Sequence, residues 1–341
     1  MTKIAIIGAG MAGLTAAQLL KDHAEVTIFE KSSSVSGRMA TRRADPYSFD
    51  HGAQFFGAKT TEFKNFIAPM IAAGVLKPWN ARFVEIENAD IVQSRNWADS
   101  YPHFVGDPGM NAVGKFLSKD LNVQVKSRVH SIEKPGNQWS LIGENCKNLG
   151  NFDWILLAIP AAQAAEILPS SLPLREEVSS IKMEGCFSVM LGFSEPLPIG
   201  FDAALVRGSD ISWISINNSK PGREGPFSML VHSTNSWADA NSHMDRGKAL
   251  DYLCSQIRRA IGHDVANAKH KAIHQWLYAN IKKQGNPTHF IDQSKNIGVC
   301  GDWVIQGRIE AAFTSGFKLA QDVLITLPKD GCKHPYAFDG V

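Results

Sequence analysis

A glycine-rich turn between a buried strand and a helix is the feature that most constrains this chain. The segment GAGMAG, residues 8–13, follows the apolar residues 4–7, and a helical pattern runs from Met11 to Lys21. A second short strand ends at Glu30, where a carboxylate can accept hydrogen bonds from ribose hydroxyls. This order is the fingerprint of a βαβ unit that binds the pyrophosphate of a dinucleotide at the start of its helix. The predicted contacts are Gly8, Ala9, Gly10, Met11, Ala12, Gly13, Glu30 and Lys31.

The segment that follows indicates which dinucleotide is bound. Many flavoproteins place Gly-Gly-Arg just after the ribose-binding acid, where the glycines let the chain pass the pyrophosphate and the arginine neutralises it. Here the sequence is Ser36-Gly37-Arg38-Met39, so Ser36 departs from the pattern at the first glycine. We predict non-covalent FAD, with Gly37, Arg38 and Met39 as contacts; a solvated surface arginine is the alternative interpretation of Arg38.

Two further segments fit the flavin end of such a cofactor. In DHGAQFF, residues 50–56, the small residues would lie against the isoalloxazine ring, and Gln54 would hydrogen-bond the flavin or a substrate amide. In residues 298–316, Asp302 would bind the ribityl or pyrophosphate region, and the last helix would direct free N–H groups at N1 and the C2 carbonyl. A strand residue, Val129, would offer backbone bonds to the adenine. The predicted contacts are Gly52, Ala53, Gln54, Phe55, Val129, Asp302, Glu310, Ala311 and Ala312.

Charge and cysteine pattern exclude several other classes of function. The net charge is +2, with no basic block or nucleic-acid motif, so no nucleic-acid partner is expected. None of the five cysteines forms a Cys-x-x-Cys pair, which argues against a metal site, and Cys300 is interpreted as a packing residue. No segment approaches the roughly 18 apolar residues of a membrane span, so we expect a cytoplasmic protein.

The pattern of strands and helices predicts a mixed α/β fold. A Rossmann-like FAD-binding domain with a doubly wound parallel sheet would carry an inserted α+β substrate domain with a mostly antiparallel sheet. The FAD-binding domain is expected to be discontinuous, over residues 1–60, 108–160 and 292–328. The substrate domain would comprise 61–107 and 161–291, followed by a polar tail, 329–341. The active site is expected between the two domains.

Several segments resemble the renalases, in particular their bacterial branch, within the wider superfamily of flavin amine oxidases. They span residues 8 to 316 and read GAGMAG, SGRMATRR, DHGAQFF, GDPGM, VHSTNSW, HQWLYA and CGDW…GRIEAAFTSG. The resemblance implies an oxidase that returns aberrant dihydronicotinamides, with hydride at the wrong ring position, to NAD(P)+. It implies hydride transfer to flavin N5 and reduction of dioxygen to hydrogen peroxide.

Candidate substrate residues come from the inserted domain. His274, Trp276 and Tyr278 share one face of a predicted strand, which would either stack on a nicotinamide ring or pack in a core. His232 would either bond a carboxamide or phosphate, or be a satisfied structural histidine. Since a dihydropyridine loses no proton when it gives up hydride, no essential acid or base is expected. The candidate catalytic residues are Gln54, His232, Trp276 and Tyr278.

Two other functions remain open from the sequence. An oxidase of a small amine would share the fold and the flavin contacts. A non-catalytic flavin or nucleotide sensor would bind the cofactor without turnover, although no appended signalling domain is visible.

Overall fold

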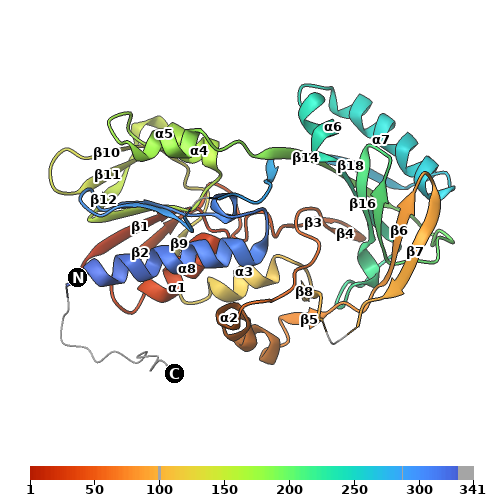
Figure 1. Cartoon of the computed structure of the whole chain (residues 1–341), viewed down its shortest axis with the longest axis horizontal. Coiled ribbons are helices and arrows are strands. Elements are labelled where there is room, and N and C mark those ends of the chain that lie inside the picture. Colours follow the sequence, from red (N-terminus) through yellow and green to blue (C-terminus); the bar gives the residue numbers. More distant parts are fainter. Residues whose placement is uncertain (99–100, 286, 329–341) are drawn as a thin grey trace.

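The computed structural model describes residues 1–98, 101–285 and 287–328, and it contains two main sheets set side by side (Figure 1). The predicted polar tail lies outside the described residues. Within the described part of the chain, no helix is long and apolar enough to cross a membrane. Nor do these residues contain a group of three or more His, Cys, Asp or Glu side chains that could hold a metal ion.

The first sheet, in the left half of Figure 1, is built on the predicted βαβ unit. Its order is β19-β20-β13-β1-β2-β9, and all neighbours are parallel except the antiparallel edge pair β19–β20. The strands are β1 (Lys3–Ile7), β2 (Glu25–Phe29), β9 (Asn122–Gln124), β13 (Trp154–Leu157), β19 (Phe290–Asp292) and β20 (Ile297–Val299).

Both faces of this sheet are covered, which explains why its strands are apolar throughout. In β1, Ile4 and Ile6 pack toward one core, whereas Ala5 and Ile7 pack toward another on the opposite face. The first core lies under α1 (Met11–Leu20), α3 (Ala112–Leu117) and α8 (Ile309–Thr326). The second is covered by α4 (Ala161–Ile167), α5 (Leu174–Ser179), β10 (Val129–Glu133), β11 (Trp139–Gly143) and β12 (Asn148–Phe152).

The second sheet, in the right half of Figure 1, has the order β18-β14-β17-β16-β15-β6-β7 and is antiparallel except between β15 and β6. Its strands are β6 (Arg82–Glu87), β7 (Asp90–Asn96), β14 (Glu184–Gly192), β15 (Ala203–Arg207), β16 (Ile211–Ile216), β17 (Ser228–Ser233) and β18 (His270–Asn280). Helices α6 (Asn235–Ala240) and α7 (Arg246–Ile261) cover its outer face.

Side chains that alternate along β14 point to the two opposite faces of this sheet. Phe187, Val189 and Leu191 are fully buried in the core that α7 closes. The intervening Ser188 instead donates a hydrogen bond to the backbone of residue 51, on the side that faces the first sheet. The second sheet therefore presents a partly polar inner face to the interior of the molecule.

Short elements connect the two halves. The hairpin β3–β4 runs from the first sheet toward the second, and the small sheet β5–β8 lies below it beside α2 (Figure 1). The bounds are β3 (Thr41–Ala44), β4 (Tyr47–Asp50), α2 (Thr61–Ala72), β5 (Leu76–Pro78) and β8 (Phe104–Gly106). Single turns of 3-10 helix occur at η1 (Glu144–Cys146), η2 (Asn217–Ser219) and η3 (Asp302–Val304).

The predicted fold class is confirmed: a parallel Rossmann-like sheet is combined with a mostly antiparallel second sheet. Two segments pack differently from the predicted division. Residues 161–179, assigned to the substrate domain, form α4 and α5 and bury Ala164, Leu168 and Val178 against the first sheet. Helix α2 also packs on the first half, since its Phe63 ring lies 5.0 Å from that of Phe313 in α8. The hydrophobic periodicity of these segments predicts that they are buried, but it does not indicate which of the two sheets they pack against.

Candidate functional site

A cavity of about 1660 Å³ lies between the two sheets and is lined by residues from both. Its volume exceeds the 300–1,000 Å³ usual for a small-ligand site, as expected for a dinucleotide together with a substrate. Most residues predicted from the sequence line it: Gly8, Gly10, Met11, Ala12, Glu30, Lys31, Gly37, Arg38, Met39, Gly52, Ala53, Gln54, Phe55, Val129, His232, Trp276, Tyr278, Asp302, Glu310 and Ala312.

Three predicted contacts lie behind the wall of the cavity. Ala9, Gly13 and Ala311 are not among its lining residues. A Cβ atom at Gly13 would lie 2.0 Å from the carbonyl oxygen of Gly8, so this glycine allows the helix to approach the turn closely. Ala9 is fully buried, and its role is to donate its backbone N–H within the chain. The sequence motif thus contains both cavity-lining and packing residues.

Gly10 is the position where the glycine turn opens onto the cavity. A Cβ atom there would meet no protein atom within 4 Å, in contrast to Gly8 and Gly13, where it would collide with backbone. Gly10 is also the N-cap of α1, so the first N–H groups of that helix lie next to this free space. The space and the helix end together suit a pyrophosphate group.

Glu30 is held at the end of β2 by two backbone groups. Its Oε2 accepts the N–H of Ala9 at 3.0 Å, and its Oε1 accepts the N–H of Ser32 at 2.8 Å. The residue is 6% exposed and lines the cavity. Each carboxylate oxygen retains a second acceptor position, which is what binding of ribose hydroxyls requires.

The departure at Ser36 has a local explanation. Its φ is +99°, a left-handed region in which glycine is preferred, and the residue is 1% exposed. The hydroxyl donates to the carbonyl oxygen of Asn111 at 3.0 Å, and the backbone N–H donates to Ala9 at 2.9 Å. These bonds hold the turn in the conformation that a glycine would otherwise favour.

The structure pairs two residues to which the sequence analysis assigned separate cofactor contacts. The guanidinium of Arg38 forms a bidentate ion pair with the carboxylate of Asp302, with Nη1 3.0 Å from Oδ2, and it also donates to the carbonyl oxygen of Ala279 at 3.1 Å. Asp302 is 5% exposed. The charge of Arg38 is therefore largely compensated within the chain, and the pair acts as one neutral unit on the cavity wall.

Glu310 has a role that the motif did not indicate. Its carboxylate accepts hydrogen bonds from the backbone N–H groups of Lys59 and Thr60 and from the Thr60 hydroxyl, at 2.7 to 3.2 Å. Thr60 is the N-cap of α2, so Glu310 joins the start of α8 to the start of α2. The backbone at the N-terminus of α8 still faces the cavity at Ala312.

Aromatic and imidazole rings gather on the inner face of the second sheet. The rings of His51 and Trp276 stack at 5.1 Å, His274 contacts both edge to face, and Trp276 Nε1 donates to the carbonyl oxygen of His51 at 2.8 Å. Burial lowers the pKa of His51 to about 4, and it lowers the pKa of His232 on β17 to about 4 as well. Both imidazoles are therefore neutral at physiological pH.

Gln54 does not fulfil the expected role as a ligand-binding amide. Its Nε2 donates to the carbonyl oxygens of Asp50 at 2.5 Å and Gly52 at 2.9 Å. Its Oε1 accepts from the Ser215 hydroxyl at 2.8 Å and from the Lys220 ammonium at 3.0 Å. Both donors and the acceptor oxygen are engaged within the chain, so Gln54 supports the cavity wall instead of contacting a ligand through its amide.

Cys300 and Trp237 lie outside the cavity. Cys300 is fully buried and is not a lining residue, and burial raises the pKa of its thiol to about 12. Trp237 packs in the core of the second sheet and stacks on Tyr252 at 5.3 Å. Trp303, by contrast, lines the cavity and donates to the carbonyl oxygen of Ile159.

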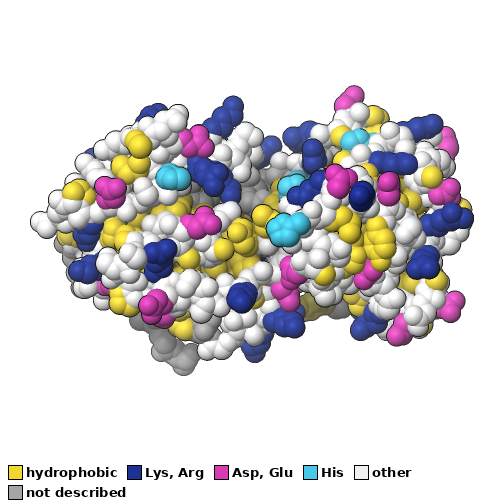
Figure 2. All heavy atoms as spheres, turned by 90° about the horizontal axis from the view of Figure 1, so that it is seen from above, with side chains coloured by type: hydrophobic (Ala, Val, Ile, Leu, Met, Phe, Trp, Pro, Cys, Tyr) yellow, Lys and Arg dark blue, Asp and Glu magenta, His cyan; other side chains and the backbone are white. Residues whose placement is uncertain are grey.

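The cavity is richer in basic than in acidic side chains. Figure 2 shows His, Lys and Arg side chains, with some Asp or Glu side chains among them, where the two halves of the molecule meet. The lining acids are Glu30, Glu166, Asp302 and Glu310; the lining bases are Lys31, Arg38, Arg43, Lys59, Lys115, Arg128 and Arg308. Three of the acids are engaged as described above, and Glu166 lies on α4, at the first sheet. Among the described residues that β14, β16, β17, β18 and α6 contribute to the lining, none is Asp or Glu.

Sequence reasoning missed several lining residues. Arg43 and His51 lie inside the quoted segments SGRMATRR and DHGAQFF, and Arg128 precedes Val129, so proximity to these predicted contacts was an available signal. Trp213 and His103 carried no such signal, because they reach the cavity only when β16 and the segment before β8 come together. The Phe55 ring lies 5.1 Å from that of His103 and 5.5 Å from that of Trp213.

Comparison with known families identifies the chain. Residues 6–69 match the NAD(P)-binding Rossmann-like domain, and residues 91–324, more than half of the chain, match the flavin containing amine oxidoreductase family. The chain belongs to this second family. It is thus a flavin-containing oxidoreductase, and membership implies FAD as the cofactor. The free space at Gly10, the carboxylate of Glu30 and the size of the cavity all fit that cofactor.

Individual relatives agree with this assignment. The chain is 24% identical to renalase of Mus musculus over 331 residues, which cover 88% of this chain and 92% of renalase. It is 51% identical to a 4,4'-diapophytoene desaturase of Staphylococcus aureus over only 51 residues. The predicted resemblance to the renalases is confirmed: the protein is a renalase-like member of the flavin amine oxidase superfamily.

Solved structures share the fold across nearly the whole chain. A putative protoporphyrinogen oxidase from Exiguobacterium superposes with a TM-score of 0.76 at 12% identity, covering 95% of this chain and 99% of its own. A variant of putrescine oxidase gives a TM-score of 0.72 at 11% identity with the same coverage of both chains. At these identities the likeness concerns the fold.

Proposed function

We propose that this flavin amine oxidoreductase holds FAD non-covalently and oxidises dihydronicotinamide dinucleotides that carry hydride at the 2 or 6 position of the ring. The products would be NAD(P)+ and, with dioxygen as acceptor, hydrogen peroxide. FAD supplies the hydride acceptor at N5. The similarity to renalase over most of both chains supports this substrate class.

The charge of the cavity is the observation that carries the proposal. The seven lining bases outnumber the four acids, and the second sheet and α6 contribute no carboxylate to the described lining. An amine substrate is a cation at neutral pH and would find no carboxylate on that side. A dinucleotide carries a pyrophosphate, which basic side chains bind through charge-assisted hydrogen bonds.

The neutral imidazoles agree with the proposed chemistry. His51 and His232 both have a pKa of about 4, and hydride leaves a dihydropyridine without removal of a proton. The residues of the inner face would therefore orient the ring and exclude water, while no side chain acts as a base. Trp276 is fixed by its bond to His51 and offers an aromatic surface at the cavity.

Anaerobic stopped-flow reduction of the bound flavin tests this function. The 2- and 6-dihydro forms of NAD(P)H should reduce the flavin rapidly, and the ordinary 4-dihydro form slowly, because an error of about 1 Å in placing the donor carbon can cost roughly two orders of magnitude in rate. If 4-dihydro NADH or a simple amine reduced the flavin as fast as the isomers, the proposal would be wrong.

Variants on β18 refine the test. Trp276→Ala should slow reduction by about tenfold or more with FAD still bound, because the ring would lose its orienting surface. Trp276→Phe should retain part of the rate. Lys271→Ala provides the matched control, since this exposed residue lies on the same strand outside the cavity lining.

A further inference from the structure

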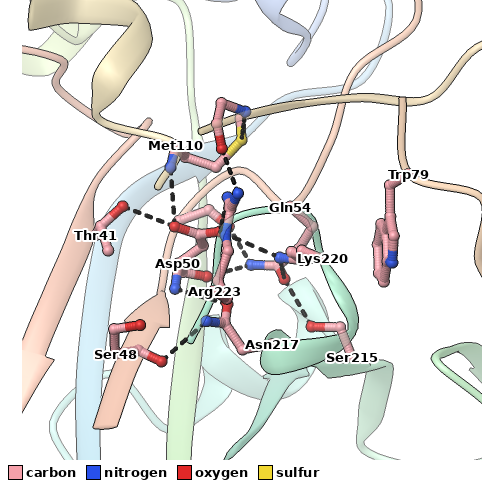
Figure 3. Close-up of polar contacts among 12 residues, drawn as sticks. Thr41, Ser48, Asp50, Gln54, Trp79, Met110, Ser215, Asn217, Lys220 and Arg223 are labelled. Carbon is pink, nitrogen blue, oxygen red and sulfur yellow. Dashed lines mark hydrogen bonds and ion pairs between the residues drawn. The ribbon is translucent and has the colours of Figure 1, made fainter. Parts of the chain in front are cut away.

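A buried cluster of charges lies directly behind the cavity wall (Figure 3). Asp50, at the end of β4, is fully buried, and its neighbours Lys220 and Arg223 are 2% and 6% exposed. Asp50 Oδ2 accepts from Arg223 at 2.6 Å and 3.2 Å and from Lys220 at 3.5 Å. Its Oδ1 accepts from the Thr41 hydroxyl at 2.7 Å and from the Met110 N–H at 3.0 Å.

This cluster contains one more cation than anion. Burial acts to raise the pKa of Asp50, but the charges of Lys220 and Arg223 bring it below its usual value, so the carboxylate is ionised. Arg223 takes the shorter bonds to it and also donates to the carbonyl oxygens of Gly106 and Pro221. The nearby Asp107 carboxylate lies beside Gly222 but pairs with Lys77. Arg223 and Asp50 thus balance one another, and Lys220 is the surplus charge.

Lys220 is connected to the cavity wall through the side chain of Gln54. Its shortest hydrogen bond, 3.0 Å, goes to Gln54 Oε1, and the face of Trp79 lies 5.2 Å behind its Nζ. The other end of the Gln54 amide donates to the carbonyl oxygen of Gly52. Gly52, Ala53, Gln54 and Phe55 line the cavity, whereas Lys220 does not.

We propose that Lys220 is a positioning residue that fixes the Gln54 amide and, through it, the segment Gly52–Phe55, and that its buried positive charge favours the electron-rich state of a flavin ring placed against that segment. Charge held near the flavin ring is one of the means by which a protein tunes the electronics of a flavin. The inference rests on the FAD site of the proposed function, with the ring beside residues 52–55 as the sequence predicts, and is independent of the substrate.

The electrostatics of the neighbouring groups support this role. Burial lowers the pKa of Lys220 to about 8; Arg223 also lowers it, and Asp50 opposes the shift. The ammonium form is therefore the main one at neutral pH. Its charge also reaches the cavity at His232, where it contributes to the low pKa after the larger effect of burial. The neutral Gln54 amide and the Trp79 ring lie against Nζ, and the Ser215 hydroxyl donates to the same Gln54 oxygen.

Sulfite binding by the FAD-loaded protein is the direct test, because sulfite adds to N5 of oxidised flavin and leaves negative charge on the ring. Lys220→Met removes the charge but keeps an unbranched side chain, and it leaves Asp50 paired with Arg223. We expect it to weaken sulfite binding by about tenfold or more and to lower the midpoint potential of the flavin. Lys220→Arg should restore part of both, and Lys64→Met, on the exposed side of α2, should change neither.

The pH profile of the wild-type protein gives a second, independent measurement. Lys220 is charged below its pKa of about 8 and loses its charge above it. Wild-type sulfite affinity should therefore fall as the pH rises through that value and above, toward the affinity of Lys220→Met. A flat wild-type profile, or a Lys220→Met protein with normal sulfite affinity and potential, overturns the inference. Failure of the proposed function is seen separately, as slow reduction by the dihydronicotinamide isomers despite normal sulfite binding.

Discussion

Glu30 shows how one side chain can serve both the fold and the cofactor. Its two oxygens accept the N–H groups of Ala9 and Ser32, which fixes the glycine turn relative to the end of β2. The same carboxylate faces the cavity at the position where the ribose of a dinucleotide is expected. We therefore expect Glu30 to contribute to cofactor binding both through direct hydrogen bonds and through the shape of the turn.

Glu30→Ala should reduce FAD affinity by about one to two orders of magnitude, because hydrogen bonds to a charged group contribute roughly 1.5–3 kcal/mol. Glu30→Gln, which keeps an acceptor oxygen, should lose less. Titration of the apoprotein with FAD measures both effects. Equal affinities in the wild type and Glu30→Ala would refute the ribose assignment.

Two histidines with a lowered pKa, His51 and His232, make the free energy of unfolding depend on pH in the acid range. The pKa values of His51 and His232 are lowered from 6.5 to about 4, so the unfolded chain binds protons that the folded chain does not bind in this range. Stability should be highest above about pH 6.5 and should decrease as the pH falls toward 4. Urea unfolding at a series of pH values measures this dependence.

A histidine variant identifies the source of that dependence. His51→Gln should lose less stability than the wild type between neutral and acid pH, whereas the exposed His243→Gln should follow the wild type. An unchanged acid dependence in both His51→Gln and the corresponding His232→Gln protein would show that other groups are responsible.

At the scale of elements, the β3–β4 hairpin connects the two sheets through its buried end. Asp50, the last residue of β4, contacts the turn before α3 through Met110 and the segment after β16 through Lys220 and Arg223. Its backbone N–H donates to Asn217 Oδ1, whose amide donates to Ser48 (Figure 3). Three chain segments are therefore joined by one carboxylate and its neighbours.

Asp50→Asn should reduce the free energy of unfolding by about 3–5 kcal/mol, because it leaves two buried cations without a counter-charge. The loss should become smaller above pH 8, where Lys220 is neutral. Equilibrium unfolding in urea at two pH values provides the measurement. Asp22→Asn, an exposed position after α1, is the control and should have little effect; a similarly small effect for Asp50→Asn would contradict the structural role.

At the scale of the whole molecule, the sheets enclose a cavity whose basic side chains favour anions. Arg43, Arg128 and Arg308 line it with no ion pair to any described acid, in contrast to Arg38. Such a field attracts a charged dinucleotide before any specific contact forms. The attraction is a property of the assembled walls, because the chain as a whole carries only +2.

Rising ionic strength should slow flavin reduction by a dihydronicotinamide dinucleotide at low substrate concentration, since the screening length falls from about 30 Å at 0.01 M to about 8 Å at 0.15 M salt. A neutral dihydronicotinamide without phosphates should show little salt dependence. Arg43→Gln should weaken the dependence, and Lys64→Gln should not. If the reduction rates with the charged and the neutral donor depended equally on ionic strength, electrostatic attraction by the cavity would be contradicted.

The sequence by itself determined the features that depend on short-range geometry. The order of strand, glycine turn and helix, the terminal acid of β2 and the apolar stripe of α8 are each set by backbone conformation and side-chain periodicity within about 30 residues. The two kinds of sheet could also be recognised in the sequence. Continuously apolar strands are buried on both faces, whereas strands of alternating polarity are buried on one face. Most of the predicted cofactor contacts lie on these elements, and they do line the cavity.

Only the tertiary structure decided which polar side chains form their hydrogen bonds within the protein. Arg38 and Asp302 stand 264 residues apart in sequence, and Gln54 and Lys220 stand 166 apart, yet each pair forms direct bonds. Nothing in a local pattern reveals such partners: Arg38 and Asp302, both predicted to contact the cofactor, bind one another, and Gln54 binds a lysine that the sequence did not single out. The placement of α4 and α5 on the first sheet has the same cause, since an apolar face specifies burial without specifying the surface that buries it.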